Sequence, residues 1–159
     1  MYFRTLVSLV ALLASASVVT AAMAAATFPA PSGWRHVEQP NSSSDGTHKF
    51  DQWKLAGDPP QTITVIEDST MSYSDALAAV KKNFTDNHIK PAIDKDETCL
   101  GRASHNVEFS VGTDGQIIIN NLLVPDGNGV IKVTYARGKG FDYDPDAKKA
   151  VTDFCAQPG

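Results

Sequence analysis

The sequence predicts an α/β (α+β) fold, in which an antiparallel sheet of about five strands carries two packed helices. Several short segments alternate β-branched or aromatic residues with polar ones, which is typical of half-buried strands. Two other segments repeat apolar residues at intervals of three and four, as amphipathic helices do. Clusters of Gly, Pro, Asn and Asp separate these segments. The predicted element order is therefore β-β-α-β-β-β-α.

The N-terminus has the three parts of a secretory signal peptide. One basic residue precedes an apolar run at 6–19, and Ala22-Met23-Ala24 forms an A-x-A cleavage site. An uncleaved membrane anchor is the alternative, but the small residues after the run and the absence of a basic flank disfavour it. We expect cleavage after Ala24, or two residues later, and export to the periplasm or the exterior. The expected division of the chain is a signal peptide at 1–24, an extended lead-in at 25–32 and a single domain at 33–159.

The charge balance argues against two classes of partner. The chain has 14 basic and 18 acidic residues, and loss of Arg4 with the signal peptide leaves 13 and 18, a net charge of −5. Nucleic acids and anionic membrane surfaces are bound through clusters of Lys and Arg, which this chain lacks. We therefore expect no nucleic-acid partner, and no membrane association after cleavage.

The first predicted structural unit is a strand pair followed by a helix. The segment 47–56 and the β-branched segment 61–67 flank a turn at 57–60, so the two strands should pair. Ser72-Tyr73-Ser74-Asp75 has the form of a helix cap. The apolar stripe after it predicts a helix that ends near Asn87, before the next proline.

The second predicted unit is an antiparallel meander closed by a helix. The segment 99–111 has the clearest period of two in the chain, and turns separate it from strands at 116–124 and 130–136. Asp144-Pro145 starts the last helix, with an acidic cap and proline at the first position. We expect the core to contain Leu77, Val80, Phe84, Val107, Phe109, Ile117, Ile119, Val133, Val151 and Phe154.

The two cysteines predict one disulfide. Cys99 should open the long strand, and Cys155 lies on the inward stripe of the last helix. In an exported chain an even number of cysteines indicates pairing, and only one pairing exists here. In the chain-entropy model, a disulfide that closes a loop of about 55 residues stabilises the folded state by about 4 kcal/mol. A reactive cysteine is the alternative, which would leave the second thiol unexplained.

The element order and apolar pattern resemble a known family of folds. The Gly33-Trp34 start, the strand pair, the helix at 74–84, the meander and the closing helix together look like the Mog1/PsbP-like α/β/α sandwich, over roughly 33–157. The resemblance contains no catalytic motif. It implies a fold, and a role as an assembly or regulatory factor that binds other proteins.

The sequence offers no clear catalytic or metal site. Its four histidines lack metal-like spacing, and there is no nucleophile elbow or phosphate-binding loop. We therefore expect no metal and no cofactor. His105 lies on the apolar face of its predicted strand, where a satisfied core histidine is the first interpretation and a catalytic base the second. Glu108 is the nearest acid, but it should point to the opposite face.

Three aromatic residues are candidates for a binding surface. Trp34, Trp53 and Tyr135 are core residues in the ordinary interpretation, and anchors of a protein or ligand site if they line a groove. The leading hypothesis is a non-catalytic protein-binding or assembly module whose partner is another envelope or secreted protein. The alternative is a carrier of an apolar small ligand between sheet and helix. A small enzyme ranks last.

Overall fold

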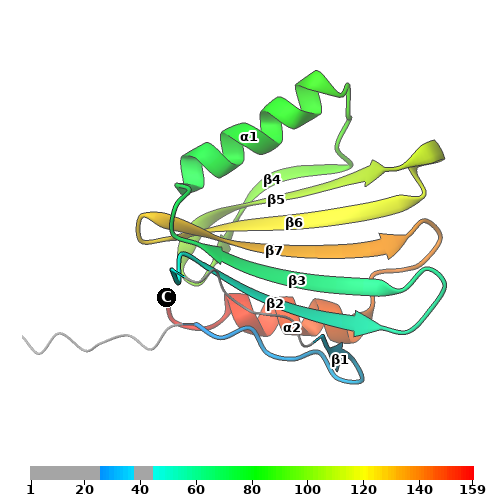
Figure 1. Ribbon diagram of the computed structural model, residues 1–159, viewed down its shortest axis with the longest axis horizontal. Coiled ribbons are helices and arrows are strands. Elements are labelled where there is room, and N and C mark those ends of the chain that lie inside the picture. The colour runs from blue at the N-terminus through cyan, green and yellow to red at the C-terminus, as the bar shows by residue number, and fades with distance from the viewer. Residues whose placement is uncertain (1–25, 38–44) are drawn as a thin grey trace, which may run out of the picture.

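The computed structural model describes residues 26–37 and 45–159, and the expected signal peptide lies outside them. Within these residues the fold is mixed α+β, with one antiparallel seven-stranded sheet in the order β1-β2-β3-β7-β6-β5-β4 and two α-helices (Figure 1). The strands are β1 (Arg35–His36), β2 (His48–Leu55), β3 (Gln61–Asp68), β4 (Ile93–Cys99), β5 (Arg102–Val111), β6 (Ile117–Asp126) and β7 (Gly129–Gly138). The helices are α1 (Tyr73–Asp86) and α2 (Pro145–Cys155).

Both helices begin at the side-chain caps that the sequence predicts. Ser72 Oγ accepts a hydrogen bond from the Asp75 amide at 3.1 Å, which satisfies a free N–H at the start of α1. Asp144 Oδ1 accepts from the amides of Asp146 and Ala147, both at 3.0 Å, at the start of α2. The predicted helix positions are confirmed.

The sheet has seven strands rather than about five. The predicted strand pair β2–β3 and the meander β5–β6–β7 are confirmed, but the sequence did not reveal β1 or β4. β1 has only two residues. β4 has the sequence IDKDETC, whose charged residues are poor strand formers. Such residues are tolerated in β4 because it is an edge strand, where charge discourages pairing with other chains.

The prediction that Cys99 opens the long strand is wrong, because Cys99 ends β4. Leu100 and Gly101 then form a tight turn with φ angles of 54° and 67°, and β5 begins at Arg102. A non-glycine residue at positive φ needs compensation. Two interactions offset the cost at Leu100. Its side chain is buried to 2% exposure, and its amide donates a hydrogen bond to the Cys155 carbonyl at 2.9 Å.

The two helices cover opposite faces of the sheet. Leu122 and Leu123 are neighbours on β6, and neighbouring strand residues point to opposite faces. Leu122 belongs to a core that includes Phe154 of α2. Leu123 packs instead with Ala76 of α1. The protein is thus a three-layer structure, and we call the two sides of the sheet the α1 face and the α2 face.

This arrangement corrects the single core that we expected. Val107 and Phe109 pack with Phe84 on the α1 face, whereas Val133 and Phe154 lie on the α2 face. Ile117 is 41% exposed and is not a core residue. Four further predicted members are half-buried and pack against the buried clusters: Leu77, Val80, Ile119 and Val151.

The predicted disulfide is present between Cys99 and Cys155, whose Cα atoms are 4.2 Å apart. It joins the end of β4 to the end of α2. The segment before Gly33 also contributes to this side of the molecule, because Phe28 packs against Trp53 and Phe154 with ring centroids 5.3 and 5.4 Å away. Among the described residues, no helix has the length and apolar character needed to cross a membrane.

Candidate functional site

One half of the α1 face forms a regular array of side chains on three adjacent strands. Strand register places nine residues of β2, β3 and β7 in three rows. The first row is Phe50, Ile66 and Lys132, the second is Gln52, Thr64 and Thr134, and the third is Lys54, Thr62 and Ala136. All nine are half-buried. We call them the open array.

The opposite side of the same three strands is closed. Trp53, Ile63, Val65, Val133 and Tyr135 all point to the α2 face and are buried, with at most 7% exposure. The difference arises because buried residues of α2 pack with Trp53, Ile63 and Val65 in one core. The α1 residues in the described cores pack instead with strand residues of β5, β6 and β7. The open array is therefore a part of the sheet over which no helix of the described residues packs.

Neutral polar groups occupy the middle row of the open array. Gln52 Nε2 donates to Thr64 Oγ1 at 3.0 Å. Thr134 Oγ1 donates to Asn121 Oδ1 of β6 at 2.7 Å. Paired in this way, the polar groups can be covered by a partner at a small desolvation cost. The row also keeps the exposed sheet face from being continuously apolar.

A groove of about 260 Å³ runs between α1 and the first row of the open array. Its walls are mainly apolar, with Asn83, Asn121 and Lys132 as the polar members. Its remaining lining residues are Met71, Ala76, Ala79, Val80, Phe84, Phe109 and Leu123. Met71, at one end, is 40% exposed. The groove thus combines apolar walls with a single cationic group.

A second concavity, of about 500 Å³, lies beyond the third row at the loop end of the sheet. Ile117 pairs there with Gly138, and a side chain built at Gly138 would contact both Pro59 and Phe141. Ile117 and Phe141 are 41% and 40% exposed. With Met71, they are the large apolar side chains exposed in the described part of the chain, and they border the open array at its two ends.

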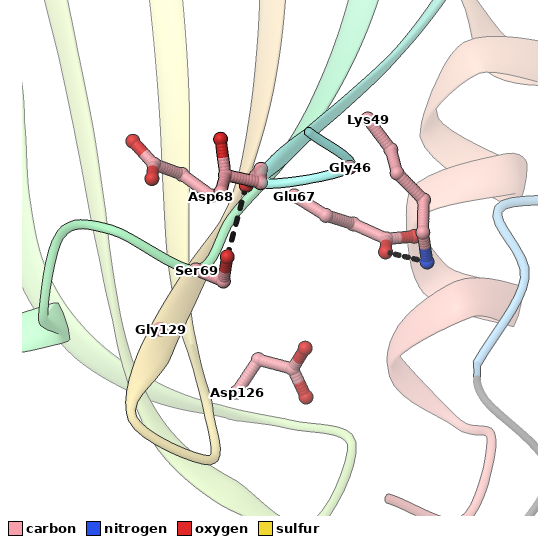
Figure 2. A pocket seen from close by; sticks show the side chains of 8 residues that line it. Gly46, Lys49, Glu67, Asp68, Ser69, Asp126 and Gly129 are labelled. Atoms are coloured by element: carbon pink, nitrogen blue, oxygen red, sulfur yellow. Dashed lines mark hydrogen bonds and ion pairs between the residues drawn. The ribbon is translucent and has the colours of Figure 1, made fainter. Parts of the chain in front are cut away.

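The pocket in Figure 2 lies at the rim of the sheet and is acidic. It has a volume of about 180 Å³, and Glu67, Asp68 and Asp126 contribute carboxylates. Lys49 Nζ lies 2.6 Å from Glu67 Oε2, and this hydrogen bond raises the pKa of Lys49. Arg102 lies 2.9 Å from Asp126. The described residues contain no group of acidic, His or Cys side chains suited to a metal ion.

His105 and Glu108 lie on opposite faces of β5, so they do not form a catalytic pair. His105 is 5% exposed, and its ring nitrogens lie 2.6 and 2.7 Å from Asp94 and Asp96 of β4. Glu108 instead forms a largely buried ion pair with Arg137 at 3.1 Å. Neither residue lines any of the three concavities described above. His105 links β5 to its neighbour β4, and the Glu108–Arg137 pair links β5 to β7 across β6.

The three aromatic candidates for binding are core residues. Trp34, Trp53 and Tyr135 are 9%, 6% and 1% exposed, so they offer no surface to a ligand. The Tyr135 hydroxyl donates to Gln61 and accepts from the Asp144 amide, which anchors the start of α2. Burial raises the pKa of Tyr135, so this hydroxyl stays protonated and can keep donating.

The residues that form the open array were not among our candidates. A signal for them exists in the sequence, because threonines alternate with buried aliphatic residues in β3, and Lys132 and Thr134 alternate likewise in β7. Such alternation predicts one polar, solvated face. What it cannot show is that β3 and β7, far apart in the chain, are neighbours in the sheet.

Comparison with known proteins establishes a fold likeness only. No family model and no curated protein matches the chain. A crystal structure of PA94, a protein of unknown function from Pseudomonas aeruginosa, is similar with a TM-score of 0.50 and 12% sequence identity. The match covers 67% of this chain and 83% of that chain. At this identity the likeness carries no functional assignment.

Proposed function

We propose that the protein is an exported, non-catalytic module that binds another protein through the open array. The observation that carries this proposal is the asymmetry of β2, β3 and β7. Their α2 face is buried under a helix. Their α1 face is half-buried, lies largely outside the cover of the described helices, and is bordered by exposed Met71, Ile117 and Phe141. Exposed apolar side chains around a polar centre are typical of surfaces that a partner covers.

Two features support export and a binding role. The Cys99–Cys155 disulfide is of the kind that persists in oxidising compartments, in agreement with the signal peptide expected at 1–24. The groups that could carry chemistry, His105 and Glu108, are engaged by charged partners within the sheet. The Mog1/PsbP-like resemblance, which implies protein binding, agrees with the same conclusion.

A carrier of an apolar small ligand is the second candidate, and the apolar walls of the groove beside α1 favour it. The size of the groove favours a protein partner instead. Small-molecule sites usually have volumes of about 300–1,000 Å³ and enclose most of the ligand. The groove measures about 260 Å³ and continues into the open array, so it can hold only one edge of a larger partner.

Site-specific photo-cross-linking in the native compartment tests the proposal. A photoreactive amino acid at Thr64, in the centre of the open array, should capture a specific protein. The same amino acid at Lys148, which is exposed on α2, should not capture it. The captured protein, once purified, should bind the wild-type chain with fixed stoichiometry. An adduct that forms equally at both positions, or a partner whose binding does not change when Thr64 is replaced by Trp, would contradict the proposal.

A further inference from the structure

The open array is positively charged in an acidic protein. Two of its nine residues are lysines, Lys54 and Lys132, and none is acidic, although the chain as a whole has 18 acidic and 14 basic residues. Within the described part of the chain, no ion pair or hydrogen bond involves either ammonium group. The next acid along this face, Asp68, is already bonded to Thr70 and lies 3.3 Å from His48.

Lys132 is the lysine whose surroundings restrict its partner most. It lines the groove with Val80, Leu123 and other apolar side chains, and no acidic residue lines that groove. The neighbouring amides of Asn83 and Asn121 can donate hydrogen bonds to an anion. A carboxylate that reaches Lys132 would therefore be bound by charge while its carbon chain is covered by apolar walls.

We infer that the partner presents an acidic segment rich in aliphatic side chains, which places a carboxylate on Lys132 and a second acidic group near Lys54. This inference rests on the proposed function, because it describes the segment that the open array would bind. The rows that contain the two lysines are separated by the neutral middle row. Neighbouring rows are separated by about 6.6–6.8 Å along the strands, and the two lysines lie two rows apart. The two acidic groups would therefore lie about 13 Å apart along the strand direction in the bound segment.

Binding of sodium decanoate is the direct test, because decanoate is a small probe that has both a carboxylate and an aliphatic chain. Decyltrimethylammonium is the matched probe with the opposite charge. We expect decanoate to shift the NMR resonances of Val80, Leu123 and Lys132, and to bind at least about tenfold more tightly than decyltrimethylammonium. Each methylene removed from the chain should weaken binding about fourfold.

Variants identify the cation that is responsible. Lys132→Met should weaken decanoate binding about tenfold or more, whereas Lys148→Met, on the exposed surface of α2, should leave it unchanged. Lys132→Gln is the second variant, and the urea midpoint of each variant shows whether it is folded. Three results would overturn the inference. They are equal affinity for the two probes, NMR shifts confined to another surface, and no NMR shift up to the solubility limit of decanoate.

Further outcomes separate this inference from the proposed function. If decanoate does not bind but the protein captured at Thr64 still binds the open array, the acidic-segment inference fails and the proposed function stands. If Thr64 captures no protein, the proposed function fails and the inference fails with it. Native mass spectrometry of protein purified from its own compartment distinguishes the source of the carboxylate. A co-purified fatty acid would overturn the choice of a protein segment.

Discussion

Two isoleucines on the same strand should lose very different amounts of stability when each is truncated to alanine. Ile63 and Ile66 of β3 point to opposite faces, and Ile63 is 0% exposed in the α2-face core whereas Ile66 is half-buried in the open array. Ile63→Ala should cost about 2–5 kcal/mol, because it removes contacts and leaves a cavity. Ile66→Ala should cost about 1 kcal/mol, roughly half the value of full burial, and it leaves no closed cavity.

Urea unfolding of the two variants, with the disulfide intact, measures this difference. A difference of about 2 kcal/mol in the free energy of unfolding separates the urea midpoints of the two variants by about 1 M, if the dependence on urea is close to 2 kcal/mol/M. The two substitutions are chemically identical and lie three residues apart, so strand propensity affects both in a similar way. Equal losses, or a larger loss for Ile66→Ala, would show that the open array is covered and that the faces of the sheet are assigned incorrectly.

Three further predictions concern single features of the fold. Replacing both Cys99 and Cys155 by Ala should lower the free energy of unfolding by about 2–5 kcal/mol in urea titrations, and oxidised wild-type protein should contain no titratable thiol. Asp144→Ala removes the cap of α2 and should cost about 0.5–2 kcal/mol, measured by thermal unfolding. The hydrogen bond from Thr70 lowers the pKa of Asp68 below its ordinary value of 3.8. The ionised Asp68 carboxylate therefore stabilises the fold at pH values above its unfolded-state pKa, and this stability is lost as the pH falls through the lower folded-state pKa. Asp68→Asn should remove this part of the acid dependence of the free energy of unfolding.

The helices and most of the strands could be predicted because their signals are local. A cap such as Ser72 or Asp144 and the apolar stripe after it act within a few residues. The missed strand β4 shows the limit of this reasoning. Its charged sequence disfavours a strand, and it forms one because β5 offers a pairing edge and the Leu100 side chain is buried at the connecting turn.

The candidate site could not be predicted because it depends on contacts between distant segments. The open array exists only because β3 pairs with β7, which brings Ile66 beside Lys132. It stays open because α1 packs on β5, β6 and one end of β7 and does not extend over β2 and β3, a property of packing that no residue in the array determines. The aromatic candidates were buried for the same reason, since Trp34 and Trp53 face a helix that is distant in sequence.

Methyl NMR of Ile63 and Ile66 is the most direct test of the central claim, that the open array is the partner-binding surface. In the free protein, a soluble paramagnetic probe should broaden the Ile66 methyl resonances and leave those of Ile63 sharp. Addition of the protein captured at Thr64 should protect the Ile66 methyl groups, while Ile63 is unchanged. Protection of Ile66 in the free protein, or broadening that persists when the partner is bound, would contradict the account.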